Sequence, residues 1–166
     1  MAMIKDPLVY HYLDIGRLGR GEVVNLFLKD AGVEFKTVLY PQASCARIQG
    51  RYDGETSQEK YIVDAVSDIY IDWRAKWAAN LSEKKPEYKD KYVPEYYRLV
   101  AQYYSDFEGP YLLGDKITYV DFAIYQSIDN DRRTGTLPSV LPEALLRFKE
   151  VFEKRPRITD YIKQNE

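Results

Sequence analysis

The hydrophobic pattern of this chain changes after Pro41, from alternating strand and helix periods to helical periods alone, and that change limits which folds are possible. Residues 7–13, "PLVYHYL", are rich in β-branched and aromatic side chains and predict a short buried strand. Apolar residues between Glu22 and Ala31 cluster on one helical face, and "EFKTVLY" predicts a second strand that Pro41 closes. Strand, helix and strand in this order predict one βαβ unit with parallel strands and a right-handed crossover.

From Ser57 onward the periodic segments are helical. The segment that starts at Ser57 predicts one helix of about 25 residues. Further helices are predicted in "VPEYYRLVAQYYSDFEG", "ITYVDFAIYQSIDNDRR", "LPEALLRFKEVFEKR" and "RITDYIKQ". We expect the nearly all-apolar "ITYVDFAIYQSIDNDRR" helix to be buried centrally. The chain is therefore predicted to be α+β, with a βαβ unit over residues 1–50, a short helix over 43–50, and an all-helical domain over 57–166.

A capping motif marks the start of the central helix. In "KITYVDF", Thr118 is placed to accept a hydrogen bond from the backbone N–H of Asp121, while the Asp121 carboxylate reaches back to the N–H of Thr118. Ile117 and Phe122 are placed to form the hydrophobic staple. We interpret this motif as a structural device and not as chemistry.

Composition excludes several classes of function. A formal net charge of -2 over 166 residues gives no reason to expect a nucleic-acid partner. Cys45 is the only cysteine, so an intramolecular disulfide and a cysteine-rich metal site are excluded, and a reducing, cytoplasmic location is expected. No apolar run approaches the roughly 18 to 20 residues of a membrane helix, and "MAMIKDPLV" lacks the apolar core of an export signal.

The stretch "VYHYLDIGRLGRGEVV", residues 9–24, carries the first candidate site. Tyr12 lies at the end of the first predicted strand, where its phenol is a candidate hydrogen-bond donor; a plain strand-end tyrosine is the alternative. Arg17 and Arg20 lie where a loop meets a helix N-terminus, a place that favours anions. Arg17 is a candidate for a substrate carboxylate and Arg20 for a structural contact, with solvated arginines as the alternative for both.

The long predicted helix carries the second candidate set. Asp64, Asp68 and Asp72 recur every four residues and form one stripe, which is either a solvated acidic face or a face that a partner covers. Arg74 and Trp77 follow one turn later and are candidates for lining an apolar pocket; core packing is equally open for Trp77. No metal site is expected.

The βαβ unit and the helical half, whose central helix begins "LLGDKITYVDF", together resemble the glutathione transferases. The segment "RPRITDYI" at 155–162 and the opening "YLDIGRLGRGEVVNLFLKDAGVEF" also resemble that family, most closely its fungal sigma-type members. The resemblance covers residues 8–41 and 51–163. The middle of the family's thioredoxin-like domain, with its cis-proline strand, has no counterpart here. The chain is then either a shortened member or a sequence that skips a stretch between Gln42 and Ala43.

The resemblance implies roles for the candidate residues. It makes Tyr12 the catalytic tyrosine, whose hydrogen bond to sulfur lowers the glutathione thiol pKa from about 8.5. It places Arg17 and Arg20 near the glutathione site. It also implies a homodimer in which Asp68 or Asp72 meets the α-amino group of the glutathione held by the other subunit. Arg74 and Trp77 would line the pocket of a small apolar or electrophilic cosubstrate.

Two functions follow from this resemblance as hypotheses. The first is an enzyme that conjugates glutathione to an electrophile, or uses its thiol transiently for trans–cis isomerisation of a double bond, as in fungal secondary metabolism. The second is a non-catalytic dimerisation or assembly module, as in the elongation-factor subunits that share the fold.

Overall fold

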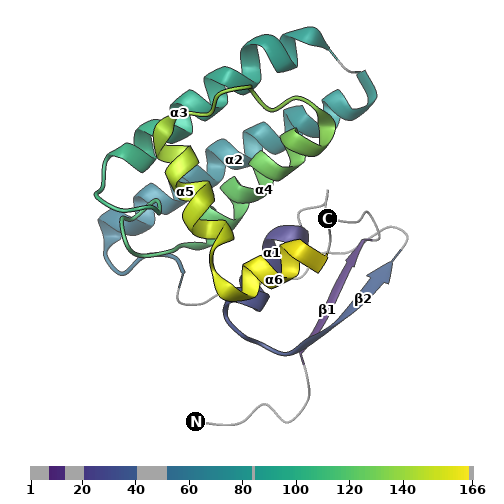
Figure 1. Cartoon of the computed structure of the whole chain (residues 1–166), viewed down its shortest axis with the longest axis vertical. Helices are drawn as coiled ribbons and strands as arrows, with labels where there is room; N and C mark the ends of the chain where they lie inside the picture. The colour runs from purple at the N-terminus through teal and green to yellow at the C-terminus, as the bar shows by residue number, and fades with distance from the viewer. Residues whose placement is uncertain (1–7, 14–20, 41–51, 84, 165–166) are drawn as a thin grey trace. The chain divides into compact units, whose positions relative to one another are not determined.

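The chain folds as a small parallel sheet unit and a set of helices (Figure 1). The computed structural model describes residues 8–13, 21–40, 52–83 and 85–164, and the side chains of these except 11–13, 39 and 40. The elements in chain order are β1 (Leu8–Leu13), α1 (Gly21–Asp30), β2 (Phe35–Tyr40), α2 (Ser57–Glu83), η2 (Tyr88–Tyr92), α3 (Val93–Ser105), α4 (Tyr119–Thr134), α5 (Glu143–Glu153) and α6 (Pro156–Gln164). This order confirms the predicted α+β class.

Backbone contacts divide the chain into two units. Met1–Gln49 and Lys154–Glu166 form the first, and Gly50–Glu153 forms the second. The end of the chain groups with its beginning because α6 packs on α1. The predicted domain bounds, 1–50 and 57–166, stay a prediction about independently folding parts.

In the first unit, β1 and β2 pair in parallel with Leu8 opposite Phe35 and Tyr12 opposite Leu39, as predicted for a βαβ connection. The predicted short helix over 43–50 lies outside the described residues. Polar contacts join α1 to α6, since the Tyr161 hydroxyl donates to Glu22 Oε2 over 2.8 Å. The sheet of described residues is only partly covered, with Leu8 39% exposed.

The contacts between α1 and α6 extend to the C-terminal end of α1. Asn25 Nδ2 donates to the Tyr161 hydroxyl over 2.8 Å. The Arg155 guanidinium pairs with the Asp30 carboxylate, and Arg157 Nη1 donates to the Asp30 carbonyl over 2.6 Å. A cation at a helix C-terminus is favourable because the last carbonyls lack partners within the helix.

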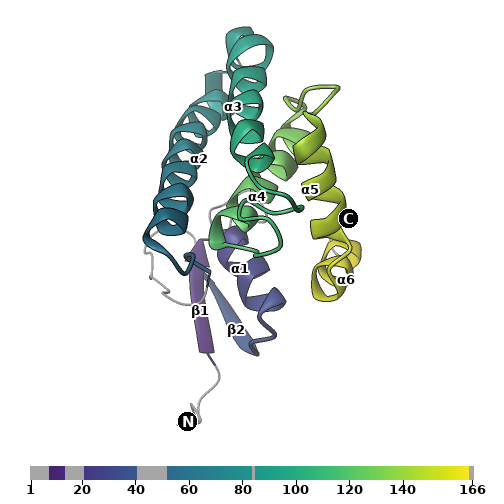
Figure 2. The same cartoon turned by 90° about the vertical axis from the view of Figure 1, so that its left-hand side faces the viewer.

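The second unit is a helical bundle around α4 (Figure 2). Every residue of α4 from Val120 to Asp131 is buried, which confirms the central burial that was predicted from the apolar residues of this helix. α4 packs on α2, α2 packs on α3, and α3 packs on α5. Of the helices described, none has the length and apolar composition needed to cross a lipid bilayer.

The capping box at the start of α4 is present as predicted. The Thr118 N–H donates to Asp121 Oδ2 over 2.6 Å. Asp121 Oδ1 accepts two further bonds, from the Tyr104 hydroxyl at 2.8 Å and from the Leu112 N–H at 3.0 Å. Burial raises the pKa of the Asp121 carboxyl, although these hydrogen bonds oppose the shift. The cap therefore also fastens α3 and the preceding loop.

A second capping box opens α2, and it was not predicted although "TSQE" carries its signature. The Glu59 N–H donates to Thr56 Oγ1 over 3.1 Å, and the Thr56 N–H donates to Glu59 Oε2 over 2.9 Å. Lys116 Nζ reaches Glu59 Oε1 at 3.1 Å. The Thr56 and Glu55 backbone bonds, and then Lys116, lower the Glu59 pKa to about 2.

A π-helical turn precedes α3 where the sequence predicted a simple helix start. In η2 the Val93 N–H donates to the Tyr88 carbonyl, five residues back. Pro94, near the start of α3, has no N–H to give to the Asp90 carbonyl, so the α-helical ladder is interrupted at this point. The turn directs Tyr88 into the interior, where it is 6% exposed.

Candidate functional site

The residues predicted around the first strand lie only partly within the described structure. Tyr12 occupies the second-last position of β1, as expected, and its side chain is outside the described set. Arg17 and Arg20 lie outside the described residues. The roles predicted for these three residues stay predictions.

The acidic stripe on α2 lies on the surface. Asp64, Asp68 and Asp72 are exposed, while Val66 and Trp73 face the core from the opposite side of the helix. Asp64 Oδ1 accepts a bond from the Tyr119 hydroxyl at 3.2 Å. Within the described ranges, no cluster of three or more histidine, cysteine, aspartate or glutamate side chains is arranged to hold a metal ion.

Arg74 and Trp77 are in contact with each other. The Arg74 guanidinium carbon lies 4.5 Å from the centroid of the Trp77 ring, in a cation–π arrangement. Trp77 is 1% exposed, and its Nε1–H donates to Thr134 Oγ1 over 3.4 Å. Trp77 therefore packs in the interior of the second unit, in agreement with the core-packing alternative.

A buried carboxylate that sequence reasoning missed organises the interior of the second unit. Asp131 is fully buried near the end of α4 and accepts four side-chain hydrogen bonds. Its Oδ2 accepts from Trp73 Nε1 at 3.0 Å and from the Tyr97 hydroxyl at 2.8 Å. Its Oδ1 accepts from the Tyr88 hydroxyl at 3.0 Å and from the Thr136 hydroxyl at 2.6 Å. One side chain thereby connects α2, η2, α3 and the loop after α4.

The donors to Asp131 are all neutral, and no lysine or arginine pairs with it among the residues that the structure describes. Burial raises the pKa of the Asp131 carboxyl, and the bonds from Thr136, Tyr97 and Tyr88 oppose that shift. Burial likewise raises the pKa of Tyr97 well above its usual range. These phenols therefore act as hydrogen-bond donors, which indicates a structural role for the cluster. Asp131 lies in the polar stretch "DNDRR" near the end of α4, so the sequence around it did not mark it as a buried residue.

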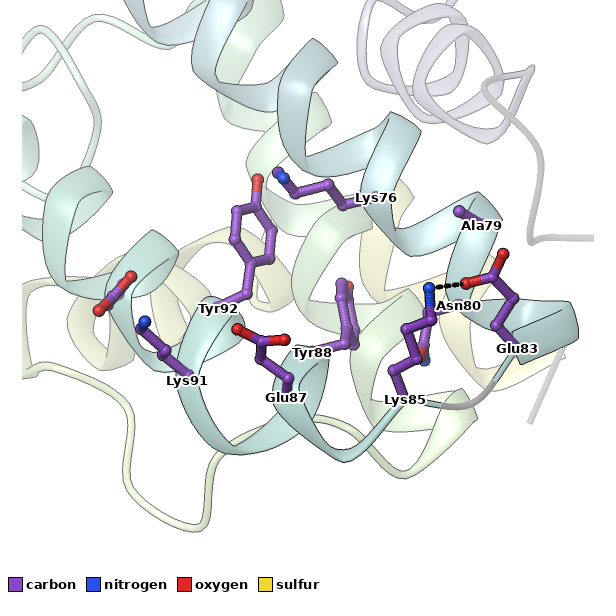
Figure 3. A pocket seen from close by; sticks show the side chains of 10 residues that line it. Lys76, Ala79, Asn80, Glu83, Lys85, Glu87, Tyr88, Lys91 and Tyr92 are labelled. Carbon is purple, nitrogen blue, oxygen red and sulfur yellow. Dashed lines mark ion pairs between the residues drawn. The ribbon is translucent and has the colours of Figure 1, made fainter.

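A cavity of about 420 Å³ lies between the last turns of α2 and the η2–α3 segment, and we call it the α2–η2 cavity (Figure 3). Three lysines, three glutamates, two tyrosines and two small or amide side chains line it: Lys76, Lys85, Lys91, Glu83, Glu87, Glu95, Tyr88, Tyr92, Ala79 and Asn80. The tyrosine rings point from η2 toward α2, and Lys76 Nζ lies 4.9 Å from the Tyr92 ring centroid. Lys85 pairs with Glu83.

Residues 71–165 match the family described as "Glutathione S-transferase, C-terminal domain". Similar curated proteins include rat glutathione S-transferase Mu 2, which is 34% identical over 117 residues, 66% of this chain and 51% of the relative. Human glutathione S-transferase Mu 5 is 33% identical over 123 residues, 68% of this chain and 53% of the relative. The chain thus spans about half the length of the curated relatives it matches.

Similar solved structures share the fold. A glutathione S-transferase from Caenorhabditis elegans aligns with a TM-score of 0.75 and 20% identity, over 96% of this chain and 98% of its own. The Pi-class glutathione S-transferase of Onchocerca volvulus aligns with a TM-score of 0.78 and 18% identity, over 95% of this chain and 92% of its own.

Proposed function

The chain belongs to the glutathione S-transferase family, and on that premise we propose that it binds glutathione and activates the thiol through Tyr12. The match of the family's C-terminal domain over residues 71–165 carries this proposal. The position of Tyr12 in β1, one residue before the strand ends, supports it. The sigma-like subtype and the shortened thioredoxin-like domain are part of the proposal.

The chemistry of the candidate residues suits the functional groups of glutathione. A phenol that donates to sulfur favours the thiolate, an arginine pairs with a carboxylate, and an aspartate pairs with an ammonium group. We assign these roles to Tyr12, to Arg17 with Arg20 nearby, and to Asp68 or Asp72 from a second copy of the chain. The exposure of both aspartates on α2 leaves them accessible to such a partner.

The thiolate would then react with a small electrophile beside Arg74. In conjugation, sulfur forms a bond to the electrophilic carbon and the leaving group departs with its electron pair. In isomerisation, the thiolate sulfur adds to a conjugated alkene, the former double bond rotates as a single bond, and expulsion of the thiolate with the C–S electron pair restores the alkene. Trp77 supports the Arg74 guanidinium through its ring face in either reaction.

Replacing Tyr12 with phenylalanine tests the enzyme proposal. Tyr12→Phe should lower the rate of conjugation to 1-chloro-2,4-dinitrobenzene at least about tenfold at neutral pH, because a thiol pKa raised by one unit corresponds to tenfold less thiolate. The pH–rate profile should shift upward with it. Retention on immobilised glutathione should persist. Tyr103→Phe, at a half-buried side chain on α3 away from every proposed site, is the matched control and should change neither measurement.

The second candidate function is an assembly module, and the exposed face of α2 favours it. Beside the acidic stripe, the large side chains of Tyr61 and Ile71 are 69% and 53% exposed on the same helix. A homodimer that covers this face is compatible with both functions. A protein that dimerises in solution, is not retained on immobilised glutathione, and is unaffected by Tyr12→Phe would identify the module and end the enzyme proposal.

A further inference from the structure

Asn80, near the end of α2, holds a polar atom without a partner. Its side-chain oxygen is fully covered and has no hydrogen-bond donor among the described residues. Leaving a buried acceptor unpaired costs about 1–3 kcal/mol. Asn80 borders the α2–η2 cavity on one side and, on the other, a cavity of about 410 Å³ near the end of α4 that also touches Thr134 and Thr136. The Asn80 side chain, with its unpaired oxygen, therefore lies between the two cavities.

Lys85 also lies between the two cavities. It borders both cavities, and its ammonium group pairs with Glu83 at the surface, where the two side chains are 68% and 51% exposed. An exposed ion pair of this kind contributes only about 0–1 kcal/mol. The Lys85 side chain can therefore swing into solvent at little cost.

Aromatic rings supply the remaining walls. The Tyr88 hydroxyl is already bonded to Asp131, so Tyr88 offers the cavity its ring and not its hydroxyl (Figure 3). The Tyr92 ring lies beside it with a centroid distance of 5.7 Å. Lysines and glutamates are equal in number around the cavity, so the lining has no net charge to attract an ion. The wall that carries both rings is the π-helical turn η2, a geometry frequently found at functional sites.

We propose that the α2–η2 cavity binds a neutral, planar aromatic molecule that donates one O–H or N–H hydrogen bond to Asn80. The rings of Tyr88 and Tyr92 provide the stacking surface, and displacement of Lys85 admits the donor group. The cavity lies wholly within the second unit and includes none of the residues assigned to glutathione or its cosubstrate. Binding there is thus independent of the transferase proposal.

A pair of probes that differ by one donor tests the assignment. 1-Naphthol has the O–H group and 1-methoxynaphthalene lacks it, and both are titrated into the full chain without glutathione. Wild type should bind 1-naphthol roughly fivefold to tenfold more tightly, as expected for one buried hydrogen bond. Asn80→Leu should abolish that preference, and Lys85→Ala should strengthen binding of 1-naphthol by up to about fivefold. Gln102→Leu, at an exposed amide on α3, is the control and should leave the preference intact.

The location of binding is read from the side-chain amide NMR signal of Asn80, and circular dichroism checks that each variant is folded. Equal affinities of wild type for the two probes would overturn the proposal. So would a preference that survives in Asn80→Leu, or binding that leaves the Asn80 signal unmoved. Loss of conjugation in Tyr12→Phe bears only on the transferase proposal, so failure of one is distinguishable from failure of the other.

Discussion

Replacing Asp131 with leucine should unfold or nearly unfold the second unit, although leucine is of similar size and better suited to a buried site. The change leaves the Trp73 Nε1–H and the Tyr88 and Tyr97 hydroxyls without their acceptor, and these side chains are 0%, 6% and 1% exposed. At about 1–3 kcal/mol for each buried unpaired donor, the cost is roughly 3–9 kcal/mol before the better burial of leucine returns part of it. Whole domains have only about 5–15 kcal/mol of stability.

Asp131→Asn should cost much less. Its amide oxygen can accept from Trp73 and Tyr97, while its NH₂ group donates to the hydroxyls of Tyr88 and Thr136, which can also act as acceptors. The charge assistance of the four bonds is lost, but so is the cost of burying the charge, so we expect a loss of no more than about 1 kcal/mol. Tyr88→Phe, which removes one donor and leaves the carboxylate three, should cost about as much.

Urea denaturation followed by tryptophan fluorescence measures these differences. Both tryptophans of the chain lie on α2 in the second unit, and one of them is bonded to Asp131, so the signal reports on this network directly. The reasoning is refuted if the leucine variant is within about 1 kcal/mol of wild type, or if asparagine is as damaging as leucine. Should the leucine variant fail to fold, the asparagine and phenylalanine variants still give the graded series.

The pH dependence of the stability difference between wild type and Asp131→Asn tests the protonation state of the Asp131 carboxyl. Because burial raises the pKa of Asp131, the folded chain binds this proton more readily than the unfolded chain. The cost of burying the charge is therefore present above the folded pKa and is relieved as the pH falls through it. Other carboxyl groups titrate equally in wild type and Asp131→Asn. As the pH falls from 7 to 4, the free energy of unfolding of wild type should therefore rise relative to that of Asp131→Asn. A change in the opposite direction would mean that hydrogen bonding to the carboxylate outweighs the cost of its burial.

Three further results are expected. Asp121→Ala removes the acceptor of the Thr118 N–H and of two other buried donors, so the free energy of unfolding should fall by at least about 2 kcal/mol in urea. Glu59 has its pKa lowered to about 2, so its contribution is complete above its ordinary pKa of 4.5 and is lost as the pH falls through 2; the melting temperatures of wild type and Glu59→Gln should converge in that range. Gly135→Ala, at φ 73° with open space around an added Cβ, should cost about 1 kcal/mol, whereas Gly109→Ala, whose Cβ would meet the Gly114 backbone at 2.4 Å, should lower the melting temperature much more.

Features whose parts are adjacent in sequence were predictable. The Thr118–Asp121 box follows from four consecutive residues, and the burial of α4 follows from its composition. The long helix from Ser57 was predicted at about 25 residues and has 27. Local sequence was sufficient here because each of these features depends on helix periodicity and on bonds between near neighbours.

Features that depend on distant partners were not predictable. The donors to Asp131 come from Trp73, Tyr88 and Tyr97, which are 58, 43 and 34 positions away, so no local pattern marks the network. The π-helical turn was missed because one interrupted backbone bond at Pro94 leaves the apolar periodicity unchanged. For the candidate site, the sequence placed Tyr12 near the end of β1 and the aspartates on an exposed face of α2, whereas their ligands stay a matter for experiment.

The packing of α6 on α1 imposes an order on folding during synthesis. The second unit is one continuous stretch, Gly50–Glu153, so the ribosome delivers all of it before α6. The first unit is split, and α6, which packs on α1, emerges only after the second unit. The usual sequence, in which the N-terminal part folds first, is therefore reversed here. Until α6 emerges, the face of α1 on which it packs is uncovered, and this nascent stage is where a chaperone would be needed most.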